Sequence, residues 1–268
     1  MAEIQSASYR HAPALAQIER LITIMQRLRG PDGCAWDRSR SFADIAPYTI
    51  EEAYEVADAI ARADMENLAE ELGDLLLQVV FHAAIATDAG HFDLVDVARG
   101  ICDKLERRHP QVFGEQNISA PVPDWDSIKA AEKPSDSALD NIPLALPALL
   151  RAEKLSRRAA RTGFDWPDAT GPLAKIHEEL AEVASAQSDA ERQAEAGDLL
   201  FAVVNYLRKL NIDAEAALRD GNRKFERRFR AIERTAGFVE LPLAAKEQLW
   251  QAEKRKPIVD GSDVPPNC

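Results

Sequence analysis

Apolar residues recur at helical spacing along most of the chain. The period of three to four residues that places side chains on one face of a helix is followed near the start by Ile18, Leu21, Ile22, Met25 and Leu28. Helices are predicted on the same ground over residues 15–28, 48–62, 65–88, 94–107, 149–160, 173–186, 191–210, 214–235 and 243–254. Alternating β-branched runs that would indicate strands are lacking, so the sequence predicts an all-α fold.

A proline-rich stretch divides the predicted helices into two series. Residues 116–147 combine repeated prolines with serine, aspartate and asparagine, a composition typical of a linker, and residues 125–132 form a candidate short helix within it. The second series repeats the order of the first, so each half is predicted to be a four-helix unit. The predicted organisation is a flexible N-terminus (1–14), a first helical domain (15–115), the linker (116–147), a second helical domain (148–255) and a disordered tail (256–268).

Closely spaced acidic residues mark two neighbouring predicted helices of the second half. The sequence Glu178-Glu179-Leu-Ala-Glu182 is followed by Glu195-Ala-Gly-Asp198. Residues three positions apart share a helix face, so each motif presents an acidic pair. If the two helices pack antiparallel, four carboxylates converge.

The same pattern occurs in the first half, where Glu52 and Glu55 are followed by Glu71 and Asp74. In both halves a glycine precedes the aspartate within a predicted helix, at a cost of about 1 kcal/mol relative to alanine. This repeated glycine predicts close helix approach or backbone crowding near the acids. A single acidic motif is more typical of a solvated helix face, but its repetition favours a functional site.

Carboxylates gathered in a partly buried place need a positive partner, because burial penalises each ion and neighbouring charges repel. Ligand sets made only of oxygen atoms suit Mg²⁺, and also Mn²⁺, rather than zinc. Magnesium commonly binds through a few carboxylates together with substrate phosphates. The acidic motifs therefore predict a site for a divalent cation.

Basic residues follow the acids in both halves. Lys224 and Arg228 lie four positions apart, as do Lys104 and Arg108, so each pair shares a helix face that can hold a phosphate chain. A salt-bridged surface is the alternative for such a motif. Neither a nucleophile triad nor a Walker A sequence is present, which favours metal-activated water as the nucleophile. Glu178 or Glu179 is the candidate to orient or deprotonate that water, and the sequence does not decide between them.

The net charge of -12 argues against binding to a nucleic acid polymer, whose phosphates attract basic surfaces. The chain has three cysteines without metal-type spacing, which favours a reducing, cytoplasmic location. The first residues lack the apolar region of a secretory signal, and the apolar runs are too short to span a bilayer. We therefore expect no membrane partner.

These motifs, together with the segment 21–29 and the sequence Cys34-Ala-Trp36-Asp37, resemble the MazG-type nucleoside triphosphate pyrophosphohydrolases in their two-domain bacterial form. The resemblance covers roughly residues 18–254. It implies an all-α fold, a homodimer and Mg²⁺-dependent hydrolysis of nucleoside triphosphates to monophosphate and pyrophosphate, with broad base tolerance. It further implies a role in removing non-standard nucleotides, or a link to stringent-response nucleotides.

Carried over to this chain, the resemblance implies that the second half is the main catalytic domain. Its metal ligands are then Glu179, Glu182, Glu195 and Asp198, and its substrate contacts are Lys175, Lys224, Arg228 and Trp250. In the first half, Glu52, Glu55, Glu71 and Asp74 form a candidate second metal site, with Lys104 and Arg108 as candidate substrate contacts.

Two further residues are candidates for substrate binding. Asn205 lies seven residues after Asp198, where the first half has Phe81 after Asp74. An asparagine amide can bind a base or a sugar, whereas phenylalanine cannot, although a buried structural asparagine is an equally good interpretation. Arg192 is a candidate phosphate contact.

A rival hypothesis is a non-catalytic helical regulator that binds a nucleotide or a protein partner through its acidic helices. The duplicated carboxylates with basic residues after them favour the enzyme, because such a scaffold has no need to repeat them.

Overall fold

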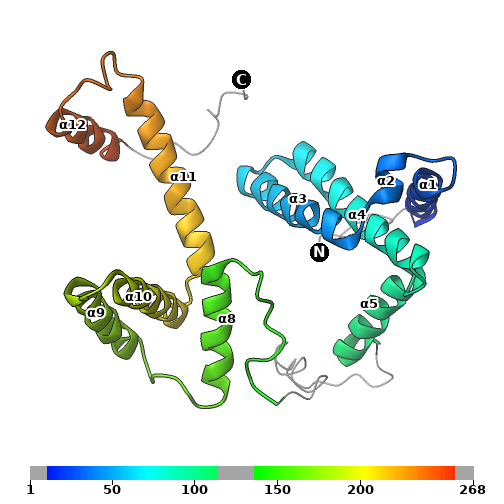
Figure 1. Cartoon of the computed structure of the whole chain (residues 1–268), viewed down its shortest axis with the longest axis horizontal. Helices are drawn as coiled ribbons and strands as arrows, with labels where there is room; N and C mark the ends of the chain where they lie inside the picture. The colour runs from blue at the N-terminus through cyan, green and yellow to red at the C-terminus, as the bar shows by residue number, and fades with distance from the viewer. Residues whose placement is uncertain (1–10, 114–135, 257–268) are drawn as a thin grey trace, which may run out of the picture. The chain divides into compact units, whose positions relative to one another are not determined.

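The computed structural model describes residues 11–113 and 136–256, and every regular element within these ranges is a helix (Figure 1). The all-α prediction is therefore confirmed. The chain divides into two compact units, with helices α1 to α6 in the first and α8 to α12 in the second. Within the described ranges, no helix is both long enough and apolar enough to cross a membrane.

The first unit is built around a pair of long helices. Its elements are α1 (His11–Arg29), α2 (Ala35–Ser39), α3 (Phe42–Arg62), α4 (Met65–Asp88), α5 (Leu94–Arg108) and α6 (Pro110–Phe113). Helices α3 and α4 pack against each other, and α1 packs against α4. The short connection between α3 and α4 includes Ala63 in the left-handed conformation (φ 54°), which ends α3, and Asp64, which caps the start of α4.

Two details of the first unit differ from the prediction. Helix α3 begins at Phe42 rather than at residue 48, because Ser41 and Asp44 form a capping box in which each side chain accepts a hydrogen bond from the other's backbone N–H. Pro47 is accommodated inside the helix. The stretch around Trp36, which lies outside the predicted helices, contains the short helix α2. Arg29 Nη1 donates to the carbonyl of Asp37 (2.6 Å) and so fixes α2 against α1.

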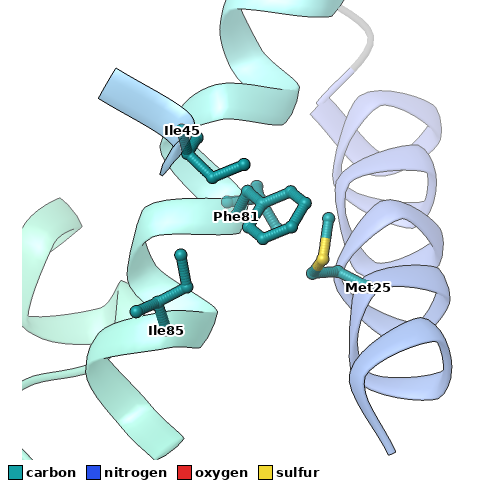
Figure 2. Close-up of a cluster of buried hydrophobic side chains, with 5 residues drawn as sticks. Met25, Ile45, Phe81 and Ile85 are labelled. Atoms are coloured by element: carbon teal, nitrogen blue, oxygen red, sulfur yellow. The ribbon is translucent and has the colours of Figure 1, made fainter. Parts of the chain in front are cut away.

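The core of the first unit lies where α1, α3 and α4 meet. Met25, Ile45, Val80, Phe81 and Ile85 form one buried cluster, and Figure 2 shows the ring of Phe81 between Met25 of α1 and Ile45 of α3. The apolar face that predicted α1 therefore packs against α4. Phe81, which occupies the register position of Asn205, is a core side chain.

The second unit has the same succession of long helices. Its elements are α8 (Ala148–Arg161), α9 (Thr170–Ser185), α10 (Asp189–Lys209), α11 (Ala214–Glu233) and α12 (Leu243–Lys254). Helices α9 and α10 pack against each other, α8 packs against α10, and α12 packs against α11. The helix predicted over residues 125–132 and the tail 257–268 lie outside the described residues, and residues 136–147 contain turns but no helix.

A largely buried ion cluster fixes the loop that leads into α9. Asp165 accepts hydrogen bonds from Arg208 Nη2 (2.6 Å) and Lys209 Nζ (3.0 Å), both at the end of α10. Burial by itself would raise the pKa of Asp165, but its ion pairs with the two cations outweigh burial and lower that pKa. The neighbouring Trp166 lies so close to Gly171 that a Cβ there would come within 2.0 Å of the indole ring.

We expect Asp165→Asn to lower the free energy of unfolding by about 2 kcal/mol, because the change leaves two cations facing each other in a mostly buried place. Since the pKa of Asp165 is lowered in the folded state, its contribution is present at neutral pH and is lost as the pH falls through the folded-state pKa. Urea unfolding of the wild-type and variant proteins at neutral pH measures the difference. Equal stabilities at neutral pH would contradict it.

Candidate metal centre

Acidic side chains from α9 and α10 come together in the second unit. Glu179, Glu195 and Asp198 each place a carboxylate oxygen within 4.8 Å of the others, and Glu178, Glu179 and Glu182 form a second group by the same measure. Glu179 belongs to both groups and is the centre of the cluster. The predicted acidic pairs are thus brought together by the packing of α9 against α10.

Glu179 is the most unusual of these acids because it is buried, with 3% of its surface exposed. Its Oε1 atom forms an ion pair with Lys175 Nζ (2.5 Å). Its Oε2 atom is buried and has no hydrogen-bond donor among the described residues. A buried carboxylate oxygen that faces other carboxylates needs a positive partner.

The charges in the cluster shift two pKa values in opposite directions. The hydrogen bond from Lys175 is the main cause that lowers the pKa of Glu179, against the effect of burial. The pKa of Glu182 is raised, first by burial and then by the neighbouring carboxylates of Glu179 and Glu195. Lys175 is held in its charged form, since Glu178 (2.8 Å) and Glu179 both raise its pKa. One lysine thus faces an excess of negative charge.

These residues fit a hard divalent cation. The donors are all carboxylate oxygens, the set that Mg²⁺ and Mn²⁺ prefer, and the unpartnered Oε2 of Glu179 lies among them. Glu179, Glu195 and Asp198 would hold such an ion, with Glu182 beside them. The oxygen ligands come from two helices, α9 and α10. From the sequence, this convergence was predicted only on the condition that the two helices pack against each other.

We expect binding of Mg²⁺ to this cluster to weaken as the pH falls through the raised pKa of Glu182, because the ion must then compete with a proton. The raised pKa also means that the metal-free protein gains stability from Glu182 as the pH falls through that value. The rise in unfolding temperature on adding Mg²⁺, measured from neutral pH down to about 5, should therefore shrink. Glu182→Gln is the control that removes this titration, and a Mg²⁺ effect independent of pH in the wild-type protein would contradict the expectation.

The predicted substrate residues close to the cluster already have partners in the protein. Lys175 contacts Glu178 and Glu179 as described, and Glu178 is exposed. Arg192, near the start of α10, pairs with Asp189 (2.8 Å) and donates to the carbonyl of Ala186 (3.3 Å).

Asn205 is buried, and its Oδ1 atom accepts a hydrogen bond from Arg208 Nε (2.9 Å) one turn along the same helix. The amide oxygen therefore has a structural contact within α10.

The remaining predicted substrate residues lie elsewhere in the second unit. Lys224 and Arg228 are on α11, and Trp250 on α12 packs against Phe225, with 5.2 Å between ring centroids. Figure 1 shows α12 beside the end of α11 that points away from α9 and α10. Within one chain, the structure does not bring these three side chains to the carboxylates.

Comparison with known proteins decides the family. The family model described as the MazG nucleotide pyrophosphohydrolase domain matches residues 40–113. The chain is 49% identical over 259 residues to the nucleoside triphosphate pyrophosphohydrolase of Escherichia coli, covering 90% of this chain and 98% of that protein. It is 44% identical over 243 residues to the nucleoside triphosphate pyrophosphohydrolase/pyrophosphatase MazG of Thermotoga maritima, covering 88% and 95% of the two chains. This chain belongs to the MazG family.

The segment that matches the MazG family model lies in the first unit, which has an acidic group of its own. Glu52, Glu55 and Glu71 place carboxylate oxygens within 4.8 Å of one another, whereas Asp74 is not part of this group. Burial, followed by the charge of Glu71, raises the pKa of Glu55. No lysine occupies the position of Lys175, where the first unit has Tyr48.

The candidate basic residues of the first unit both lie on α5. Lys104 is exposed, and Arg108 is the last residue of the helix. Helix α5 packs against α4. The acidic group of the first unit lies on α3 and α4, so α5 carries the basic residues next to one of the two helices that carry the acids.

The two glycines that precede the aspartates are not sites of close packing within their units. A Cβ added at Gly73 or at Gly197 would meet no atom of the described MazG residues within 4 Å. The prediction of close helix approach at these positions is therefore wrong for the single chain. Both glycines leave open space beside the acids.

Two polar residues in largely buried environments were not predicted from the sequence. Asp165, described above, follows no recognisable spacing relative to its partners at the end of α10. Gln78 is buried in α4, and its Oε1 atom has no partner. In the sequence Gln78 reads only as an interruption of an apolar run.

Proposed function

We propose that this chain hydrolyses nucleoside triphosphates to nucleoside monophosphates and pyrophosphate, and so removes unwanted nucleotides from the cellular pool. Its membership of the MazG family and its 49% identity to the nucleoside triphosphate pyrophosphohydrolase of Escherichia coli support the reaction class. The observation in the structure that best supports it is the carboxylate cluster around Glu179, whose buried Oε2 atom lacks a partner.

In this proposal the carboxylates of α9 and α10 bind Mg²⁺, with Mn²⁺ as a substitute. When bound, the ion would lower the pKa of a water molecule and neutralise charge on the phosphates. Glu179, Glu195 and Asp198 act as ligands. Glu178 is exposed and lies in the group around Glu179, so it is the better placed of the two candidates to accept a proton from water.

Lys175 has a double role in the proposed site. In the metal-free protein it holds Glu179 in place through its ion pair. Its side chain is 38% exposed, so it can turn toward a phosphate once a cation has taken over the neutralisation of Glu179. Lys175 would then contribute mainly to substrate binding.

We also propose that the functional form is a homodimer. Leu180 on α9 and Leu200 on α10 are each more than half exposed, and Phe201 beside them is 41% exposed. Exposed apolar side chains of this size on two packed helices favour burial against another surface. Because Lys224, Arg228 and Trp250 do not reach the acids of their own chain, a second copy is also a candidate source of basic groups for each site.

The test is incubation of the protein with a nucleoside triphosphate and Mg²⁺, followed by separate assays for pyrophosphate and orthophosphate. Pyrophosphate and nucleoside monophosphate in equal amounts are expected. Orthophosphate as the first product would place cleavage at the γ-phosphate and contradict the proposal. Binding of nucleotide without any product would favour the non-catalytic regulator instead.

A further inference from the structure

The end of α10 carries a chain of hydrogen bonds that the proposed metal centre does not use. Arg208 donates through two nitrogens of its guanidinium group, from Nε to Oδ1 of Asn205 (2.9 Å) and from Nη2 to Oδ1 of Asp165 (2.6 Å). The other carboxylate oxygen of Asp165 accepts from Lys209 Nζ (3.0 Å). The side chains of Arg208 and Asp165 are only 11% and 19% exposed, so these bonds are largely shielded from water.

Arg208 fixes the orientation of the Asn205 amide. A guanidinium group has donors and no acceptor, so its Nε–H can bond to the oxygen of the amide but not to the nitrogen. The oxygen and nitrogen of an asparagine amide otherwise exchange places by a half-turn about the last torsion. With its oxygen held by Arg208, the amide directs its N–H groups away from the arginine.

Asn205 lies on the face of α10 that carries the acids. It follows Asp198 by seven residues, which is about two helical turns, so both side chains leave the helix on nearly the same side. Lys209 shares this face, and it donates to Asp165 and to the carbonyl of Trp166 in the loop before α9. A substrate whose phosphates lie at the carboxylates can extend along this face as far as the amide of Asn205.

In the first unit, apolar residues occupy the corresponding positions. Ten residues after the aspartate of the acidic motif, where the second unit has Arg208, the first unit has Ala84. In the register of Asn205 the first unit has Phe81, a core side chain. The packing of the two long helices in the first unit thus needs neither the arginine nor the asparagine.

We propose that Arg208 is a positioning residue for substrate binding: it holds the amide of Asn205 so that an amide N–H donates to an oxygen atom of the bound nucleotide. Asp165 holds Arg208 from the other side. This inference rests on the proposed function for the identity of the substrate. The competing interpretation is that Arg208 only joins the loop to the end of α10, where its charge also interacts favourably with the helix dipole.

A double-mutant cycle separates the two interpretations. The values of kcat and KM for pyrophosphate release from ATP are measured with Mg²⁺ for the full-length protein, Arg208→Met, Asn205→Ala and the double variant. Each single change should raise KM about tenfold, the scale of one lost hydrogen bond, with kcat nearly unchanged. Because Arg208 acts through Asn205, the double variant should have nearly the same KM as Asn205→Ala.

Two results of the cycle would overturn the proposal. One is an Arg208→Met change that raises KM by the same factor in both backgrounds, since its effect would then not pass through Asn205. The other is an unchanged KM in Asn205→Ala. Arg157→Met is the control, because Arg157 is 52% exposed and pairs with Glu153 on its own helix, and it should leave KM unchanged.

Asn205→Asp tests the orientation of the amide directly. Aspartate keeps an oxygen atom for Arg208 but has no N–H to donate, so KM should rise as in Asn205→Ala while the unfolding temperature lies at or above that of Asn205→Ala. A KM equal to that of the wild type would contradict the proposed orientation. If Arg208→Met lacks the helicity of the wild type, Arg208→Lys replaces it in the cycle, because lysine keeps the charge beside Asp165 but has a single nitrogen.

Failure of the proposed function would be recognised separately. A wild-type protein that releases no pyrophosphate contradicts that function, and the cycle is then measured as the dissociation constant of ATP with Mg²⁺ by calorimetry. A tenfold weaker affinity in each single variant, with no further loss in the double variant, would support the positioning role. Additive losses, equal affinities or the absence of ATP binding would overturn it.

Discussion

Replacement of Glu179 by glutamine is expected to reduce pyrophosphate release by about a thousandfold or more, since a bound metal ion contributes several kcal/mol to charge stabilisation in the transition state. Glu179 is the residue shared by both carboxylate groups of the second unit. Glutamine keeps the size of the side chain but supplies a neutral ligand. The loss of turnover should therefore reflect lost metal binding rather than lost packing.

The stability of the metal-free protein should also fall with this change. The ion pair with Lys175 holds the pKa of Glu179 below its usual range, so the ionised carboxylate stabilises the folded state at neutral pH. The unfolding temperature of metal-free Glu179→Gln should therefore lie below that of the wild-type protein. Addition of Mg²⁺ should raise it less than in the wild type.

Glu52→Gln is the matched control, because Glu52 holds the corresponding position in the first unit. It should retain most of the pyrophosphate release. Turnover that survives in Glu179→Gln and disappears in Glu52→Gln would move the chemistry to the first unit. A variant that is inactive and unfolded would be recognised by its circular dichroism, and Asp198→Asn would then take its place.

The helices of this fold could largely be predicted because the apolar period that indicates a helix is a property of neighbouring residues in the sequence. Helix α12, for example, has the bounds that were predicted from its apolar period. The acidic motifs also depend on local spacing, since residues three apart share a helix face. Their convergence needed one further step, the packing of α9 against α10, and the short connection between these helices made that the simplest arrangement.

What local spacing cannot show is where a helix points after a turn. The pairs Lys224 with Arg228 and Lys104 with Arg108 were predicted to hold phosphate because they follow the acids in sequence. In the second unit, α11 leads away from α9, so its basic residues are separated from the carboxylates of the same chain (Figure 1). The direction of α11 is set by its contacts with other helices, and the residue types in its sequence do not indicate it.

Burial of polar groups is hidden from the sequence for a similar reason. Gln78 of α4 is buried in a unit where α4 packs against both α1 and α3, and no local spacing indicates that burial. The start of α3 shows the reverse case: Ser41 and Asp44 form a capping box that is a local signal, whereas the predicted helix began only at residue 48. Acids at regular spacing can therefore be predicted as site residues from the sequence, whereas isolated buried polar residues cannot.

Removal of divalent metal is expected to abolish pyrophosphate release, and added Mg²⁺ should restore it. In Glu195→Gln the concentration of Mg²⁺ needed for half-maximal activity should rise by about tenfold or more, because the variant retains the other carboxylates but loses one anionic ligand. Glu71→Gln is the control, since Glu71 precedes Asp74 as Glu195 precedes Asp198. Its Mg²⁺ requirement should match that of the wild type, because the first unit lacks a lysine equivalent to Lys175 and is not expected to turn over substrate.

Titration of the Glu195→Gln and Glu71→Gln variants with Mg²⁺ distinguishes the two acidic groups. The quantity compared is the Mg²⁺ concentration at half-maximal activity, which a general loss of stability does not change. A destabilised variant loses maximal activity at every Mg²⁺ concentration, whereas a lost ligand moves the midpoint and leaves much of the maximum. Equal midpoints in Glu195→Gln and the wild type would show that the carboxylates of α9 and α10 do not hold the activating ion. A shift in Glu71→Gln alone would assign that ion to the acidic group of the first unit.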